Sequence, residues 1–240
     1  SRLIACGSHP GIPEWDERFL NQMKGALTLV DSIALHIYLG GGTNDIDFAE
    51  NDYLSLLASI DTFEQALSRA CGLVQAYSTP DHSIGVVLDE WGTWYRQATV
   101  ESGLYQQNTM RDALFTAASF HCFHQHGKNL WMTNMAQTIN VLQSLVLTRG
   151  HEAIVTPTYH VYEMFRPHRD GILLPVTVQD SPVLALTDGK SRPALSVSST
   201  ISEDNRQIFV SLINLDLSQP LTVNCELSDG VNWKVKQVRQ

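Results

Sequence analysis

The sequence predicts an α/β fold. Residues 1–168 are expected to form the second half of a closed (β/α)8 barrel, and residues 169–240 part of an antiparallel β-sandwich. Two observations predict this division. Up to about residue 168, short apolar segments alternate with segments of helical pattern, which is typical of parallel βα units. Beyond that point the segments are short, rich in Val, Leu, Thr and Ser, and separated by turn residues, which is typical of an antiparallel sandwich.

Four segments of the first part are expected to be strands, because they are continuously apolar without alternation, as in strands covered on both faces. They are residues 3–6, 30–35, 84–88 and 130–132. Helices are expected at residues 15–26 after Pro13, at 62–77 with Thr62 as the cap, and at 110–126 before Gly127.

The second part is expected to hold six strands, at residues 172–178, 183–186, 194–200, 207–214, 221–226 and 232–238. Asp-Gly and Asp-Asn turns separate several of them. The four strands of the first part suit either a small open sheet or half of a barrel, which needs about 250 residues in full. Because the chain opens inside an apolar strand, we expect the half barrel, with its first half upstream of Ser1.

The composition narrows the class of partner. The 240 residues carry 16 basic and 25 acidic side chains, a net charge of −9, and only 17% are charged. A nucleic acid needs clustered Lys and Arg, so no nucleic-acid partner and no membrane partner is expected. A neutral ligand such as a sugar fits better. The four cysteines form no CxxC pair and are expected to be reduced, mostly buried thiols. The compartment stays open, with a cytoplasmic location slightly favoured over a periplasmic or secreted one.

Residues 84–95 carry the most chemical information. A buried strand runs directly into Asp89 and Glu90, and the aromatic residues Trp91, Trp94 and Tyr95 follow. Barrel enzymes hold their active sites at the carboxyl ends of strands, so this pattern favours glycoside chemistry. Because successive strand side chains point to opposite faces, only one of the two carboxylates is expected to face the barrel axis. Alternatively, both acids cap the following loop while Trp91 and Trp94 lie in the core.

His36 and Tyr38 lie two residues apart at the end of another expected strand, and therefore on one face. A tyrosine hydroxyl can hold a nucleophilic carboxylate, and a histidine can donate to it or tune its ionisation. A hydrogen-bonded core histidine is the alternative for His36. Gln137, beside the fourth strand, can reach sugar hydroxyls or cap the following segment.

His121, His124 and His126 lie near the end of the third expected helix. The spacing of His121 and His124 can clamp a metal ion, but neither an HExxH pattern nor a partner carboxylate accompanies them. A helix C-terminus favours histidine in any case. We therefore expect neither a metal site nor a cofactor.

Six ordered segments, at residues 3–8, 33–38, 89–95, 105–114, 134–137 and 156–162, together resemble the second half of glycoside hydrolase family 51, the α-L-arabinofuranosidases. The resemblance covers nearly the whole chain. It implies a (β/α)8 barrel with a jelly-roll-like β-sandwich, and a retaining mechanism that uses two glutamates.

The resemblance also implies residue roles. Glu90, in the Asp-Glu-Trp motif, is the expected nucleophile, and Tyr38 is expected to hydrogen-bond it. The expected substrate-binding residues are His36, Tyr38, Gln137, Cys6 and Trp91.

In family 51 the acid/base glutamate lies in a Gly-Asn-Glu motif on the fourth strand, which has no counterpart in this sequence. A retaining glycosidase needs both carboxyl groups, so an N-terminal chain or fragment is expected to supply the second one and to complete the barrel. A homo-oligomer, trimeric or hexameric, is implied as well.

The expected activity is the exo-acting release of α-L-arabinofuranosyl residues from arabinan, arabinoxylan or their oligosaccharides. The alternatives are a related barrel glycosidase, such as a xylosidase or endoglucanase, and a noncatalytic carbohydrate-binding subunit.

Overall fold

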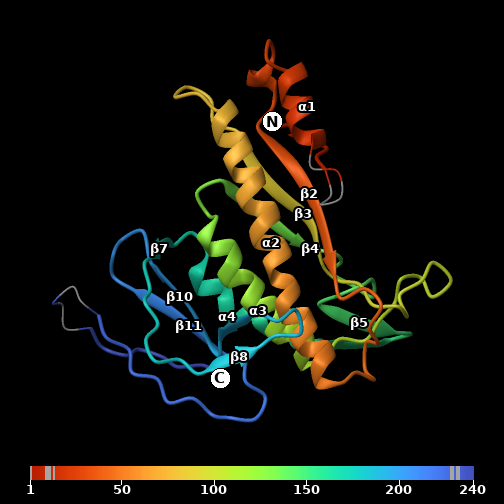
Figure 1. The fold of residues 1–240 in the computed structure, drawn as a ribbon, viewed down its shortest axis with the longest axis vertical. Helices are drawn as coiled ribbons and strands as arrows, with labels where there is room; N and C mark the ends of the chain where they lie inside the picture. The colour runs from red at the N-terminus through yellow and green to blue at the C-terminus, as the bar shows by residue number, and fades with distance from the viewer. Residues whose placement is uncertain (1, 9–11, 13, 228–229, 231–232) are drawn as a thin grey trace.

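A computed structural model describes residues 2–8, 12, 14–227, 230 and 233–240 (Figure 1). In chain order its elements are β1 (Ile4–Ala5), α1 (Glu14–Gln22), the 3-10 turn η1 (Leu27–Leu29), β2 (Ser32–Leu39), α2 (Glu50–Tyr77), β3 (Gly85–Thr93), α3 (Met110–Gln125), β4 (Leu130–Met135), β5 (Val146–Arg149), β6 (Glu152–Val155), α4 (Pro157–Phe165), the 3-10 turn η2 (Arg166–His168), β7 (Ile172–Leu174), β8 (Val183–Ala185), β9 (Ser191–Pro193), β10 (Leu195–Ile201) and β11 (Ile208–Asn214).

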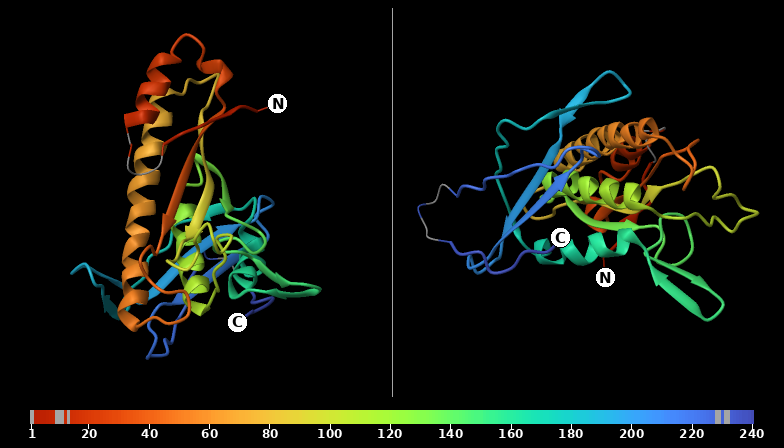
Figure 2. Two further views of the ribbon diagram at one scale, coloured as in Figure 1. Left: turned by 90° about the vertical axis from the view of Figure 1, so that its right-hand side faces the viewer. Right: turned by 90° about the horizontal axis from the view of Figure 1, so that it is seen from below.

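The first four strands form one parallel sheet in the order β1-β2-β3-β4. Spatial order therefore follows chain order, as consecutive βα units require when each crossover returns to the next position. The long helix α2 runs along one face of β2 and β3 in both views of Figure 2, and it packs against both strands. The parallel strands and their crossover helices confirm the α/β class.

Strand alternation explains the core between this sheet and its helices. Ile33, Leu35 and Ile37 of β2 point to the helix side, and β3 contributes Val86 and Leu88. Helices α2 and α3 pack apolar side chains against these strand residues, including Leu57, Phe63, Leu67, Phe115 and Phe123. This layer supports the strand ends that carry the polar residues.

The opposite face of the parallel sheet is open in the described chain. Ile4, Trp131 and Met132 are exposed although they are large and apolar. Gly85 accommodates the indole of Trp131, since a Cβ at this glycine would overlap the ring. His36 and Tyr38 also belong to this face, because they alternate with the core residues of β2.

Strands β11, β10 and β7 form an antiparallel sheet, in which β10 and β11 pair from Leu195↔Asn214 to Ile201↔Ile208. Helix α3 joins this sheet to the parallel one. His121 hydrogen-bonds with Ser196 and Ser211 at 2.8 Å each, and His124 with Ser198 at 2.7 Å. Antiparallel strands are therefore present after residue 168, although antiparallel pairing begins earlier, in the β5–β6 hairpin.

Several boundaries differ from expectation. Helix α2 begins at Glu50 instead of residue 62, because Tyr53, Leu56 and Ile60 already extend its apolar face. The expected strand at residues 172–178 ends at Leu174, and residues 221–226 form no strand. Of the expected strand at 232–238, residue 232 lies outside the described residues and 233–238 are not in a strand. The hairpin β5–β6 and helix α4 were not expected.

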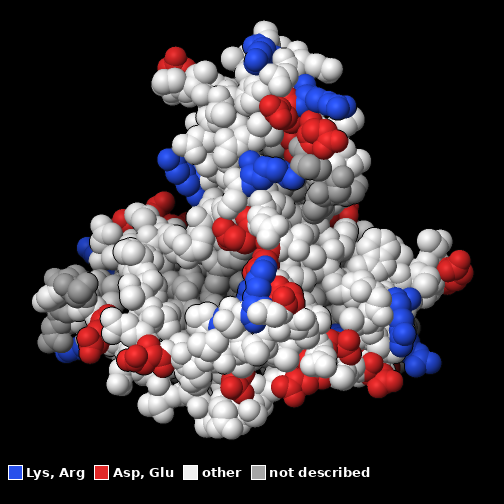
Figure 3. Space-filling model, in the orientation of Figure 1, with Lys and Arg blue, Asp and Glu red and all other residues white. Residues whose placement is uncertain are grey.

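On the face drawn in Figure 3, Lys and Arg side chains stand singly or in small groups among acidic and uncharged residues. None of the described helices is both long enough and apolar enough to cross a membrane.

Candidate active site

Tyr38 and Glu90 meet where two neighbouring parallel strands end. The Tyr38 hydroxyl donates a 2.7 Å hydrogen bond to Oε2 of Glu90. Burial and the bond to this carboxylate raise the pKa of Tyr38 above its usual value, so the phenol stays protonated and remains a donor. The expected hydrogen bond between Tyr38 and Glu90 is present.

His36 lies between two carboxylates. Its Nε2 is 3.1 Å from Oδ1 of Asp89, and its Nδ1 is 3.5 Å from Oε2 of Glu90. The expectation that only one of these acids shares the face of His36 is therefore wrong. The physical reason is a β-bulge: Leu35 pairs with Leu88 and His36 with Glu90, so Asp89 is an extra residue in β3.

The three polar side chains are open to solvent. The exposed fractions are 49% for His36, 34% for Asp89 and 42% for Glu90. A substrate can therefore reach Glu90, and the alternative of His36 as a buried core histidine does not apply. The acids do not serve merely as caps, because both contact the imidazole.

Trp91 has no exposed surface. Its ring packs edge-on against Phe63 and Phe123, at centroid distances of 5.8 and 4.8 Å. The expected substrate contact from Trp91 is therefore wrong. Strand alternation after the bulge directs Glu90 to the open face and its neighbour Trp91 into the helix-covered core.

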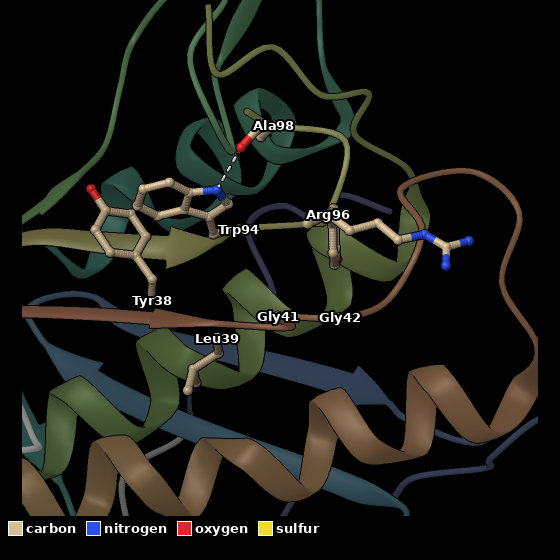
Figure 4. A pocket seen from close by; sticks show the side chains of 8 residues that line it. Tyr38, Leu39, Gly41, Gly42, Trp94, Arg96 and Ala98 are labelled. Atoms are coloured by element: carbon tan, nitrogen blue, oxygen red, sulfur yellow. Dashed lines mark hydrogen bonds between the residues drawn. The ribbon is translucent and has the colours of Figure 1, made fainter. Parts of the chain in front are cut away.

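Trp94 is the indole that lines a pocket beside the site. The pocket holds about 390 Å³ and is lined by Tyr38, Leu39, Gly41, Gly42, Trp94, Tyr95, Arg96 and Ala98. Figure 4 shows the rings of Tyr38 and Trp94 side by side while Arg96 extends away from them. The rings meet edge-on at 5.3 Å, and Trp94 Nε1 donates a 2.8 Å hydrogen bond to the Ala98 carbonyl.

A buried polar network holds the chain that follows Glu90. Asp112 Oδ1 accepts hydrogen bonds from Thr93 Oγ1 at 2.9 Å and from the Tyr95 hydroxyl at 2.8 Å. The Gln106 side chain accepts from the Tyr95 amide, and Gln143 accepts from the Thr93 amide. Sequence reasoning missed this network, since its partners come from three separate segments. The available signal was the presence of polar residues such as Asp112 within otherwise apolar stretches, which indicates buried hydrogen bonds.

Gln137 and Cys6 lie at the carboxyl ends of the two outer strands. Gln137 is exposed just after β4, where the preceding amide of Ala136 donates a 3.1 Å hydrogen bond to the Trp91 carbonyl. Cys6 is exposed just after β1, and its carbonyl accepts a hydrogen bond from Trp15. Within the described residues neither side chain bonds Glu90, so their sugar contacts stay predictions.

The expectation of mostly buried cysteines is wrong. Cys71 is buried and Cys122 partly buried, whereas Cys6 and Cys225 are exposed. Cys6 directly follows β1, an outer strand of the parallel sheet in the described part of the chain.

A parallel sheet with acids, a tyrosine and a histidine at its carboxyl edge defines the class of α/β proteins to which barrel glycosidases belong. The family model described as the alpha-L-arabinofuranosidase C-terminal domain matches residues 89–240. The chain therefore belongs to the α-L-arabinofuranosidases of glycoside hydrolase family 51 and matches their C-terminal part. The resemblance seen in the sequence is confirmed.

Individual relatives agree. An intracellular exo-α-L-arabinofuranosidase of Bacteroides ovatus is 31% identical over 233 residues, which are 94% of this chain and 44% of that protein. An intracellular exo-α-(1→5)-L-arabinofuranosidase of Bacillus subtilis is 25% identical, over 88% of this chain and 44% of that protein. The crystal structure of the family 51 arabinofuranosidase from Xanthomonas axonopodis pv. citri matches with a TM-score of 0.79 and 31% identity, over 90% of this chain and 44% of that one. The chain thus spans less than half the length of these relatives.

Proposed function

We propose that this chain supplies the nucleophile of a retaining exo-α-L-arabinofuranosidase that acts on arabinan, arabinoxylan or their oligosaccharides. The observation that carries the proposal is Glu90 at the end of a parallel strand, held by the Tyr38 hydroxyl at 2.7 Å and approached by His36. Membership of the arabinofuranosidase family supports the sugar.

In the proposed reaction, a carboxylate oxygen of Glu90 attacks the anomeric carbon of the arabinofuranosyl unit while the bond to the leaving oxygen breaks. An acid protonates that oxygen. Water, deprotonated by the same group, then displaces Glu90 and releases arabinose. The Tyr38 donor keeps the attacking carboxylate in one orientation, and the reaction requires no metal or cofactor.

We also propose that residues 1–168 are strands five to eight of a (β/α)8 barrel and that residues 169–240 belong to a β-sandwich. The matching chain order and spatial order of β1 to β4 supports this, as do Ile4, Trp131 and Met132 on the open face. Closing the barrel would cover these apolar side chains.

The acid/base glutamate belongs, in this proposal, to a segment that forms the first half of the barrel. Retaining glycosidases place their two carboxyl groups about 5–5.5 Å apart. Because the side chain of Glu90 is 42% exposed on the open face, that face has room for a second carboxyl group. We call this chain together with the first half of the barrel the completed enzyme.

The test compares aryl α-L-arabinofuranoside with aryl xyloside and glucoside as substrates of the completed enzyme. Arabinofuranoside hydrolysis with retained anomeric configuration is expected. Preferred hydrolysis of the xyloside or glucoside would favour a related barrel glycosidase, and sugar binding without hydrolysis would favour a noncatalytic subunit. Native and denaturing mass spectrometry, run side by side, establishes whether a second chain is present in the sample.

Replacement of the nucleophile sharpens the test. Glu90→Ala is expected to lower turnover of the arabinofuranoside by several orders of magnitude, and added azide should restore release of the aryl group by forming the arabinofuranosyl azide of inverted configuration. The matched control is Glu101→Ala, which removes a fully exposed carboxylate. Near-normal turnover in Glu90→Ala would contradict the assignment.

A further inference from the structure

Three potential metal ligands converge where helices α2 and α3 pack together. Cys122 and His126 are four residues apart at the carboxyl end of α3, so they share one helix face. Glu64 comes from α2, 58 residues earlier in the sequence than Cys122. In the described part of the chain this is the one group of three such side chains whose ligand atoms lie within 4.8 Å of one another.

The group lies in the helix layer, which covers the face of the sheet opposite to His36 and Glu90. Sequence reasoning set metal binding aside because no carboxylate accompanies the histidines of α3 along the chain. The fold supplies that carboxylate from α2.

The contacts meet at a single oxygen. Oε2 of Glu64 lies 3.4 Å from Sγ of Cys122 and 3.2 Å from Nε2 of His126. A tetrahedral zinc ion bound at about 2.0–2.3 Å separates its ligand atoms by about 3.3–3.6 Å. The two separations that involve Oε2 lie within about 0.2 Å of that range, and all three ligand atoms lie within 4.8 Å of one another, so small side-chain adjustments suffice to bring them around one cation.

A supporting residue fixes the carboxylate. Ser68 Oγ donates a 3.0 Å hydrogen bond to Oε1 of Glu64, which leaves Oε2 to face Cys122 and His126. Such outer hydrogen bonds orient the ligands in metal sites. The side chain of His126 is 11% exposed and that of Glu64 is 53% exposed, so solvent reaches the group on the side of Glu64.

We propose that Glu64, Cys122 and His126 bind a divalent cation of the zinc class and thereby fasten α2 to α3. One sulfur, one nitrogen and one oxygen ligand suit Zn²⁺ or Co²⁺, and water takes the fourth position through the open side. Because the thiolate is the form of cysteine that binds a metal, metal binding releases the Cys122 proton.

The test uses the completed enzyme, freed of metal with a chelator and titrated with Co²⁺ at pH 7.5. We expect one equivalent to bind, with a thiolate-to-cobalt charge-transfer band in the near ultraviolet and the visible bands of a four-coordinate ion. Added Zn²⁺ should abolish both. Absence of stoichiometric binding, or binding without the charge-transfer band, would overturn the proposal.

Variants assign the ligands. Cys122→Ser should remove the charge-transfer band, and His126→Gln should weaken Co²⁺ binding at least 10-fold. Glu64→Gln changes an exposed helix position and should also weaken binding without unfolding the chain. The matched control is Cys6→Ser, which removes an exposed thiol on the other side of the sheet. Equal affinity in Glu64→Gln and the unaltered chain would contradict the site.

Discussion

The hydroxyl of Tyr38 and Oε2 of Glu90 are joined by a 2.7 Å hydrogen bond, although the residues stand 52 positions apart. The bond links the ends of β2 and β3, which pair in parallel, so the sheet itself brings donor and acceptor together. The same carboxylate oxygen lies 3.5 Å from His36. Tyr38 and His36, both on β2, therefore approach the same oxygen atom, Oε2 of Glu90.

Tyr38→Phe removes this donor without changing the shape of the ring. A hydrogen bond to a charged group contributes about 1.5–3 kcal/mol, so we expect kcat/KM of the completed enzyme for an aryl arabinofuranoside to fall about 10- to 150-fold. Tyr77→Phe, at the end of α2, is the control and should leave the rate unchanged. An unaltered rate in Tyr38→Phe would show that the bond does not serve the reaction.

Trp94 and Trp91 should respond differently to substitution. Trp94→Ala removes an aromatic wall of the pocket, and KM should rise several-fold, up to about 10-fold. Trp91→Phe shrinks a buried side chain and should lower the melting temperature while KM stays the same. Steady-state kinetics and thermal unfolding of both variants check this pair. The opposite assignment of the two effects would contradict the structure.

Asp112 should contribute to stability. It is fully buried, caps α3 by accepting from the Thr109 amide at 2.7 Å, and accepts from Thr93 and Tyr95. Asp112→Ala leaves these donors unpaired and should lower the free energy of unfolding by about 1–3 kcal/mol. Urea denaturation measures the change. Asp81→Ala, at an exposed turn, should alter the midpoint little.

The histidines between α3, η2 and the antiparallel sheet should make the fold acid-sensitive. Burial and the neighbouring imidazoles lower the pKa of His121 to about 3, and that of His124 to about 4; burial also lowers the pKa of His168. Each ring hydrogen-bonds with hydroxyls of β10 or β11, and the titratable groups facing one another there are these three histidines.

The sign follows from linkage. Below the ordinary pKa of about 6.5 the unfolded chain takes up protons that the folded chain refuses, so stability falls as the pH drops from about 6.5 toward 4. The urea midpoint should therefore be lower at pH 5 than at pH 7.5. His124→Gln should reduce this difference, whereas His151→Gln, at an exposed turn, should preserve it. An unchanged difference in His124→Gln would count against the cluster.

Much of the fold follows from periodicity. The runs that became β2, β3 and β4 are continuously apolar, and helix α3 begins at the predicted residue, Met110, where Thr109 and Asp112 form a capping box. The start of α2 was misplaced because its first turns carry a weaker pattern, with Glu50 and Asp52 ahead of the apolar face. Hairpin β5–β6 was missed although Ala153, Ile154 and Val155 are apolar, because each of its strands is only four residues long.

The hydrogen bond between Tyr38 and Glu90 was expected from the resemblance to family 51, and the position of both residues near the ends of neighbouring strands is consistent with it. The contact of Asp89 with His36 was not, because a bulge changes the phase of a strand without leaving a mark in its composition. Trp91 was misassigned although alternation alone, with Glu90 on the open face, directs it into the core. The proposed metal ligands were not predicted from the sequence, because Glu64 and Cys122 become neighbours only when helices α2 and α3 pack together.

The extra residue in β3 has a consequence for how this site tolerates changes of chain length. Leu88 and Trp91 both belong to the core, three positions apart, while regular alternation would place core residues two apart. Deleting Asp89 would restore the even count, so the indole would keep its cavity and Glu90 its partner on β2. Removal of Asp89 therefore preserves the assignment of residues to the two faces of the strand, at the loss of its 3.1 Å contact with His36. A one-residue deletion elsewhere in the same strand would instead move every following side chain to the opposite face of the sheet, so that core residues would become exposed and exposed residues buried.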